Sequence, residues 1–202
     1  MRCLLLLVLA SGCIIPFATP PLKGEIGGAT RIGRASRLDD NEQRSGDSSM
    51  HAAVGSHVAS ATLSDRQKFD VGAGWTMEKT KDSMSNGAYL DTSWFFDRAS
   101  HARTSVGARG EVRWLDEGHA AAAKLRIDTE LFDTGTRDFT GDDKCGTTSG
   151  TLFGTTAIGV FVEAGRVWAP EMSGGNAWVA TAGVTVRLPG TAGVWIGIPW
   201  CK

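Results

Sequence analysis

Four histidines and their neighbouring serines are the side chains of this chain best suited to acid–base or nucleophilic chemistry. His57 has Ser56 directly before it and Ser60 shortly after it, and His101 also has serines on both sides. A nucleophile and its base must lie within hydrogen-bond reach of each other, and a third group must orient the base. Nearness in sequence does not supply that geometry, so no catalytic residue is predicted. The four histidines are His51, His57, His101 and His119.

An acidic stretch from Asp133 to Asp143 carries the side chains best suited to a calcium ion. Its carboxylates include Asp138 and Asp142, but their spacing does not match a calcium-binding loop, and a solvated turn explains them better. The four cysteines form no Cys-x-x-Cys or Cys/His cluster with zinc-ligand spacing. The sequence therefore predicts no metal and no cofactor.

The cysteine with the clearest chemistry is Cys13. It follows Arg2, the apolar run Leu4-Leu5-Leu6-Leu7-Val8-Leu9-Ala10 and the small pair Ser11-Gly12. A basic start, a short apolar core and small residues before a cleavage point are typical of a secretory signal peptide. With Cys13 directly after them, the first thirteen residues resemble the signal of a bacterial lipoprotein.

The lipoprotein resemblance implies that the chain is cut just before Cys13. It also implies that the Cys13 thiol receives a diacylglycerol and that the new amino terminus receives a further fatty acid such as palmitate. Two or more acyl chains hold a protein stably on a membrane. The alternative is an ordinary signal peptide cut after Ala18, which would discard Cys13. A transmembrane helix would need about 20 apolar residues, and Pro16 interrupts the run.

Composition favours one exported β-rich domain. The formal net charge is −1, with 21 basic and 22 acidic residues, so no electrostatic case for nucleic acid exists. The 26 glycines and 7 tryptophans, with few helical patterns, favour an all-β chain with many turns. We expect a signal peptide over residues 1–12, a lipidated disordered linker over 13–49 and a β-barrel domain over 50–202. The linker is expected because residues 14–49 are rich in Pro, Gly, Ser and charge.

Period-two alternation dominates the chain after residue 50. Val106, Ala108, Val112 and Trp114 would share one face of a strand, while the charged residues between them would share the other. Turn residues separate the alternating segments, which predicts an eight-stranded up-and-down antiparallel β-barrel. The eight segments are 51–63, 68–77, 88–97, 104–115, 121–131, 156–167, 177–188 and 194–198.

Alternation alone does not say which face of the barrel is inside. A soluble lipocalin-like barrel would bury the apolar face, whereas a membrane barrel would turn it towards lipid. Strands of about 10 residues suit a tilted membrane span. Tryptophans near strand ends suit an aromatic girdle. We assign the girdle to Trp75, Trp94, Trp114, Trp168 and Trp178.

The membrane alternative implies a barrel interior filled with paired charges, since eight strands leave room for side chains only. Glycines on that face, among them Gly72 and Gly74, would make room for long basic side chains. In this respect the chain resembles the small eight-stranded outer-membrane barrels of Gram-negative bacteria, without any diagnostic motif. The predicted interior network comprises Asp70, Asp91, Arg109, Glu111, Arg113, Lys124, Arg126, Asp128, Glu130, Glu163 and Arg187.

Two further expectations follow from this eight-strand topology. The segment 133–151 would be a long loop at the outer end of the barrel, where envelope or extracellular proteins could bind. Cys145 in that loop would then lie far from Cys201 at the terminus, which makes a disulfide between them awkward.

Three functions remain open at this point. The first is a lipid-anchored bacterial outer-membrane protein with a small transmembrane barrel, a structural or surface-interaction role, no open pore and no enzyme activity. The second is a lipid-anchored soluble barrel that binds a small apolar ligand in the periplasm. The third is a barrel hydrolase that acts on lipids.

Overall fold

The computed structural model describes residues 13–32, 48–62, 64, 66–81, 83–115, 118–169 and 175–197. These residues form one antiparallel sheet of ten strands and one short helix. In chain order the elements are β1 (Cys13–Thr19), β2 (Leu22–Ile32), β3 (Ser48–His57), α2 (Val58–Ala61), β4 (Phe69–Lys79), β5 (Met84–Arg98), β6 (Ala102–Leu115), β7 (Gly118–Asp142), β8 (Gly146–Ala169), β9 (Gly175–Leu188) and β10 (Gly190–Gly197).

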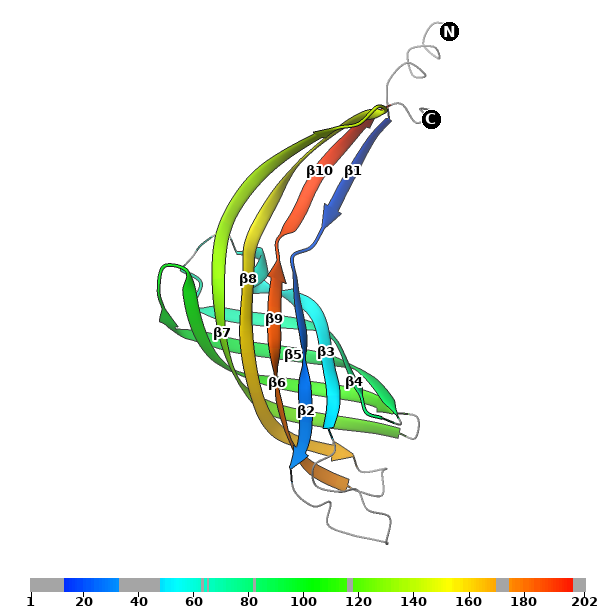
Figure 1. The fold of residues 1–202 in the computed structure, drawn as a ribbon, viewed down its shortest axis with the longest axis vertical. Coiled ribbons are helices and arrows are strands. Elements are labelled where there is room, and N and C mark those ends of the chain that lie inside the picture. Colours follow the sequence, from blue (N-terminus) through cyan, green and yellow to red (C-terminus); the bar gives the residue numbers. More distant parts are fainter. Residues whose placement is uncertain are drawn as a thin grey trace, which may run out of the picture.

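Eight strands, β2 to β9, close into a ring. Each strand pairs antiparallel with the next one along the chain. The ring closes where β9 pairs back with β2, from Leu22 opposite Leu188 to Ile32 opposite Trp178. The predicted all-β, eight-stranded up-and-down barrel is therefore confirmed (Figure 1).

The membership of the ring differs from the prediction at both ends of the chain. Strand β2 belongs to the ring, although it lies in the segment expected to be a disordered linker. Residues 194–197 of the strand expected over 194–198 belong to β10, outside the ring, and residue 198 lies outside the described residues. The linker prediction is therefore wrong for 13–19 and 22–32. Strand β2 escaped notice because glycines surround its single central apolar residue, Ile26, and its order comes from pairing with β3 and β9. The predicted signal peptide over 1–12 and the linker segment 33–47 lie outside the described residues.

Strands β7 and β8 are 25 and 24 residues long, whereas the other ring strands have 10 to 15 residues. Beyond the ring they stay paired with each other, β10 joins β8, and β1 joins β10. We call this four-stranded sheet the extension; it comprises β1, β10 and the parts of β7 and β8 between Asp133 and Thr156. Figure 1 shows it leaving the barrel and bending to one side.

The extension overturns the expected loop over 133–151. Most of that segment is strand, and only 143–145 form the turn between β7 and β8. Successive ring strands run in opposite directions, and β2 starts at the end of the barrel where β1 precedes it. Strand β7, the sixth strand of the ring, therefore returns to that end, and the β7–β8 hairpin leaves the barrel beside β1 and β10. We call this the extension end, and the end with the β4–β5 and β6–β7 turns the opposite end.

Cys145, in the turn at the tip of the extension, is disulfide-bonded. Strand β10 ends beside it, since a Cβ atom on Gly197 would lie 2.5 Å from the carbonyl oxygen of Cys145. The expectation that this turn and the C-terminal strand lie at opposite ends of the barrel is therefore wrong. Cys201 itself lies outside the described residues.

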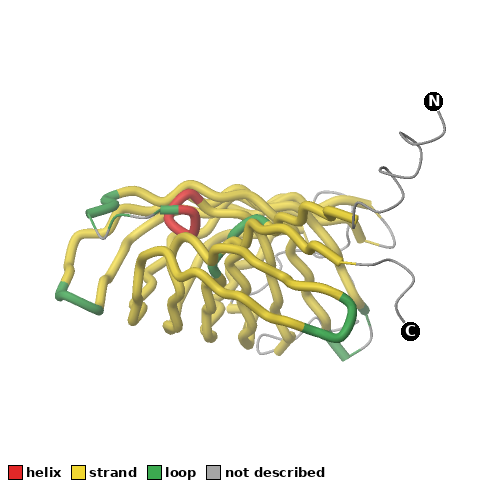
Figure 2. Tube along the Cα trace, turned by 90° about the horizontal axis from the view of Figure 1, so that it is seen from above, coloured by secondary structure: helices red, strands yellow, loops and turns green. Residues whose placement is uncertain are grey.

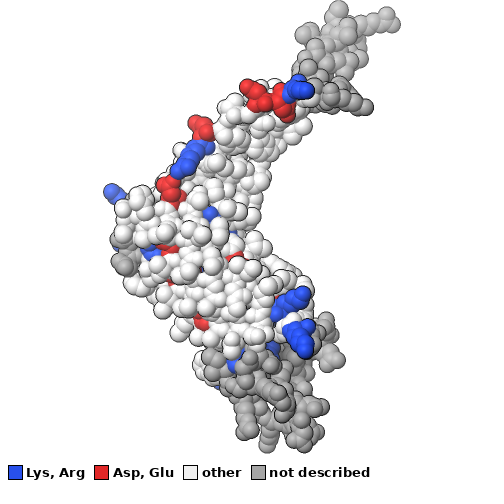
Figure 3. Space-filling view, viewed as in Figure 1, with Lys and Arg blue, Asp and Glu red and all other residues white. Residues whose placement is uncertain are grey.

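The two faces of the barrel have opposite character. Large apolar side chains point outwards, and Leu125 is 71% exposed and Leu90 63% exposed. The inward-facing positions between them carry charges, and Arg126 and Arg109 are each only 1% exposed. Figure 3 accordingly shows a largely uncharged surface over the barrel strands, with charged side chains along the extension. The residues inside the barrel are therefore not the apolar core of a lipocalin-like protein.

The short helix α2 packs over the extension end of the barrel interior (Figure 2). The Ala59 N–H donates to Asp70 at 2.9 Å, and the Ser60 hydroxyl accepts a hydrogen bond from Arg187 at 3.0 Å. Gly154 of β8 allows this approach, because its φ is +107° and a Cβ atom there would lie 2.2 Å from the Ser60 carbonyl oxygen. No helix in the described ranges has the length and apolar character to cross a membrane.

Candidate functional site: the charged barrel interior

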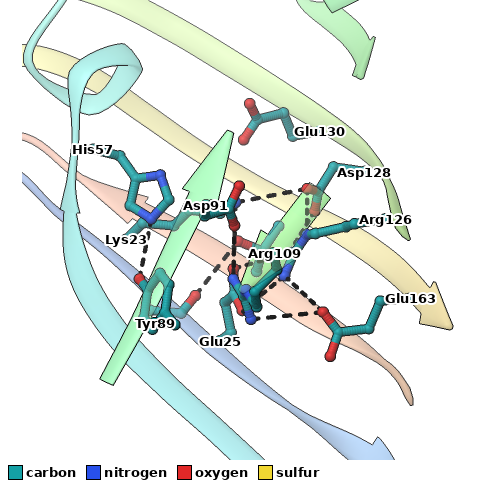
Figure 4. A network of polar contacts seen from close by, with 12 residues as sticks. Lys23, Glu25, His57, Tyr89, Asp91, Arg109, Arg126, Asp128, Glu130 and Glu163 are labelled. Carbon is teal, nitrogen blue, oxygen red and sulfur yellow. Dashed lines mark hydrogen bonds and ion pairs between the residues drawn. The ribbon is translucent and has the colours of Figure 1, made fainter. Parts of the chain in front are cut away.

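Glu25 of β2 is the centre of the polar network inside the barrel (Figure 4). Its carboxylate accepts hydrogen bonds from Arg109 at 2.8 and 3.0 Å and from Arg126 at 2.9 Å. Lys23, two residues earlier on the same face of β2, lies 3.3 Å away. All four side chains are at most 2% exposed, so their charges are neutralised by one another rather than by water.

Each arginine at this centre also bonds a second carboxylate. Arg109 donates to Asp91 at 2.8 Å, and Arg126 donates to both oxygens of Asp128 at 2.6 and 2.7 Å. The guanidinium of Arg126 also lies 4.1 Å from the centre of the Phe161 ring, which adds a cation–π contact. These bonds connect β2 across the interior to strands on the far side of the ring.

A second cluster lies towards the opposite end of the barrel. Lys124 donates to Glu111 and to Glu163, both at 2.7 Å. Arg113 also donates to Glu111, at 2.8 Å, and forms an ion pair with Glu78. The cluster therefore bridges β4, β6, β7 and β8.

A third cluster lies beneath α2 at the extension end. Arg187 donates to Glu130 at 2.8 Å and to Asp70 at 2.6 Å, in addition to its bond to Ser60. Arg103 donates to the same Glu130 at 2.7 Å, and its guanidinium lies over the ring of Phe95 at 4.3 Å. The helix is thus tied directly to charges inside the barrel.

His57 is held between a carboxylate and a phenol. Its Nδ1 lies 3.1 Å from Asp70, and its Nε2 lies 3.0 Å from the hydroxyl of Tyr89. Gly72 and Gly74 make room for these rings, because a Cβ atom on either would collide with the ring of His57 or Tyr89. The predicted space-making role of these glycines therefore serves two rings rather than basic side chains.

The remaining three histidines lie in other parts of the fold. His51 is buried against the ring of Phe161, with the ring centroids 6.3 Å apart. His101 lies in the β5–β6 turn and His119 is exposed near the start of β7. Both ring nitrogens of His57 face Asp70 and Tyr89, so neither engages a serine, and no group of three or more potential metal ligands occurs in the described ranges.

All eleven residues assigned to the interior network from the sequence are buried in the barrel. They join with four charged residues that the sequence reasoning missed, which are Lys23, Glu25, Glu78 and Arg103. Lys23 and Glu25 were missed because they lie in the segment assigned to the linker. Lys23 and Glu25 are two residues apart and alternate with the uncharged Gly24 and Ile26, and this alternation is the signal that could have found them. Glu78 and Arg103 continue the inward positions of β4 and β6 beyond the limits expected for those strands.

The charges inside the barrel nearly balance. In the described part of the chain, seven basic and eight acidic side chains are buried. The basic ones are Lys23, Arg103, Arg109, Arg113, Lys124, Arg126 and Arg187, and the acidic ones are Glu25, Asp70, Glu78, Asp91, Glu111, Asp128, Glu130 and Glu163. Mutual pairing of this kind joins strands through the interior and leaves few charges facing solvent.

The five tryptophans assigned to a girdle all point outwards and are between 38% and 58% exposed. Trp75 and Trp114 stack with ring centroids 5.3 Å apart near the opposite end, where Trp168 and Trp178 also lie. Trp94 lies towards the extension end, where Phe69 contacts it edge-on at 4.1 Å. The structure therefore distributes them over both ends of the barrel's outer surface.

No family model, no curated protein and no solved structure matches this chain.

Proposed function

We propose that this protein is an outer-membrane lipoprotein of Gram-negative bacteria whose eight-stranded barrel spans the membrane. The observation that carries the proposal is the inversion of the two faces, with apolar side chains outside and paired charges inside. Each exposed large apolar side chain would cost about 1.5 to 3 kcal/mol in water relative to burial. A bilayer removes that cost, and a surface of this extent is typical of contact with lipid or another apolar partner.

The dimensions of the outer surface support a membrane span. On β4 the outward-facing residues from Phe69 to Met77 carry no charge, and Lys79 follows them at the strand end. Nine residues at a tilt of about 40° cover about 23 Å, close to the apolar band of about 25 Å in outer-membrane barrels. Tryptophans near both ends of the band match the interfacial positions that such side chains prefer.

The interior supports a structural or surface-interaction role without an open pore or enzyme activity. Ion pairs fill the barrel, and α2 packs over the extension end. An apolar ligand would have to displace these charges, so the interior does not favour the soluble ligand-binding alternative. The Tyr89–His57–Asp70 arrangement is buried among them, so we assign it to packing.

The proposed anchor is a lipid on Cys13, where β1 begins. A lipid on this residue would lie in the periplasmic leaflet, which would place the extension end of the barrel on the periplasmic side. The extension would then be the part of the protein available to other envelope proteins, instead of an external loop.

The Cys13→Ser variant tests the barrel and the lipid separately. We expect it to remain in the membrane fraction and to require detergent for extraction, because the barrel holds it there without the lipid. Unheated samples should migrate differently from boiled samples on denaturing gels, as a folded barrel does. Wild-type protein and a soluble periplasmic protein serve as controls. Release of Cys13→Ser as a soluble monomer would refute the transmembrane barrel, and an unmodified Cys13 in the mature wild-type protein would refute the lipid anchor.

A further inference from the structure

The extension carries an apolar face that continues the outer surface of the barrel. Strands β7 and β8 pass from the ring into the extension without a change of register. Outward-facing positions such as Leu131 therefore share a face with Phe139, and Ile158 shares it with Leu152. The pairing of β8 with β10 and of β10 with β1 adds three more residues to this face. We call Ile15, Phe17, Phe139, Leu152 and Trp195 the outer face of the extension.

Glycines allow the aromatic rings to lie flat on this face. One row across the four strands reads Phe139, Gly150, Gly193 and Phe17. A Cβ atom on Gly150 would lie 2.7 Å from the Phe139 ring, and one on Gly193 would lie 2.7 Å from the Phe17 ring. The two rings approach each other over these glycines, with centroids 6.4 Å apart.

The next row adds an indole to the same surface. Trp195 is paired with Thr148 and Ile15, and its ring covers the neighbouring Gly197. None of the residues in this row or in the phenylalanine row carries a charge. Arg137, which pairs with Leu152 on this face, forms an exposed ion pair with Asp133, so the uncharged part of the face consists of these two rows.

The opposite face of the extension differs in its chemistry. Asp138 and Asp142 lie there and accept hydrogen bonds from Thr151 at 2.7 Å and Thr147 at 2.8 Å. The apolar residues of this opposite face, among them Ile14 and Ile196, are aliphatic and lie on β1 and β10. The outer face instead carries the three aromatic rings of Phe17, Phe139 and Trp195, and aromatic side chains are the ones enriched at membrane interfaces.

We propose that the outer face of the extension lies on the lipid surface beside the barrel, so that the extension is a flat arm on the periplasmic leaflet. This inference rests on the proposed membrane span. Figure 1 shows the extension bending to one side, so it does not continue straight along the barrel axis and away from the bilayer. The position of Cys13 supports it independently. Strand β1 begins at Cys13 at the far end of the extension, about 20 Å from its barrel end, so a lipid there reaches the same membrane only if the extension lies along it.

Adjacent positions on one strand test the proposal. A bimane label is placed at Thr148→Cys, on the outer face beside Trp195, or at Ser149→Cys, on the opposite face, in the full-length protein in proteoliposomes. Lipids with a nitroxide on the acyl chain should remove about half of the Thr148 signal and little of the Ser149 signal, while iodide in the buffer should do the reverse. The fluorescence of protein without an introduced cysteine, treated with bimane in the same way, is subtracted. Replacing Phe17 and Phe139 together with Ser should abolish the lipid quenching at Thr148.

A third label at Val160→Cys, on the outer surface of the barrel, separates the two proposals. If lipid quenches Val160 but iodide quenches Thr148 and Ser149 equally, the inference on the extension is wrong and the membrane span stands. If lipid does not quench Val160, the proposed function itself is wrong. Protection of Thr148 in detergent that increases with protein concentration would identify a second copy as the occupant and would also overturn the inference.

Discussion

Replacing Glu25 with Gln should weaken the barrel more than any other single amide substitution in its interior. The Glu25 carboxylate is fully buried and neutralises Arg109, Arg126 and Lys23 at distances of 2.8 to 3.3 Å. Removing one partner of a buried ion pair costs about 3 to 5 kcal/mol, because the other charge stays buried. Both arginines keep a second carboxylate, so we expect the lower limit, a loss of about 3 kcal/mol in the free energy of unfolding.

A double-mutant cycle with Lys23→Met isolates the electrostatic cause. Lys23 has Glu25 as its nearer partner and Asp128 at 3.6 Å, so the double variant Lys23→Met/Glu25→Gln removes a basic and an acidic group together. It should recover about 1 to 2 kcal/mol relative to the sum of the single losses. Urea unfolding in lipid vesicles, followed by tryptophan fluorescence and gel migration, measures all four proteins. Additive losses, or a Glu25→Gln variant as stable as the wild type, would refute the charge-network reasoning.

Tyr89→Phe removes the hydroxyl bonded to His57 but no ring packing, so unfolding should become easier by about 1 kcal/mol in the same urea assay, and an unchanged midpoint would contradict that bond. Gly154→Val places a side chain against the α2 backbone at a residue with a positive φ, so α2 should leave the barrel end. Proteolysis between β3 and β4 should then be faster than in the wild type, and an unchanged cleavage rate would contradict the packing of α2 on Gly154. Peptide mapping without reduction should join Cys145 to Cys201. Residue 13, at the start of β1, is separated from Gly146 by β10, and two strand spacings of about 9.6 Å in total are beyond disulfide reach. A peptide joining Cys145 to the start of β1 would refute this pairing and the lipid anchor together.

The charged interior was predictable because strand alternation is local. From Arg109 to Arg113, and from Lys124 to Glu130, every second residue is charged, and this periodicity assigns these side chains to one face in any sheet. The same argument separates the outward tryptophans from the charges. Neither conclusion required knowledge of which strands pair.

The two ends of the chain were not predictable in this way. Residues 22–32 contain three glycines and few apolar side chains, and they form a strand because β3 and β9 supply hydrogen-bond partners on both sides. The residues of β9 that pair with β2 are 146 to 166 residues away in sequence, from Ile32 opposite Trp178 to Leu22 opposite Leu188, so no local pattern reports that pairing. The error moved Glu25, the centre of the interior network, into a supposed linker, and it reversed the end of the barrel from which the β7–β8 hairpin emerges.

The sequence by itself determined that this chain makes alternating strands with one charged and one apolar face, because side-chain direction in a strand depends only on residue parity. Which face is inside was decided by the closure of the ring, since only a closed eight-stranded barrel brings Glu25, Arg109 and Arg126 from distant strands within hydrogen-bond distance. The tertiary structure also decided that β7 and β8 extend beyond the ring and collect β1 and β10. That arrangement follows from long-range pairing, and it places Cys13 and Cys145 at the same far end of one sheet, with β10 between them.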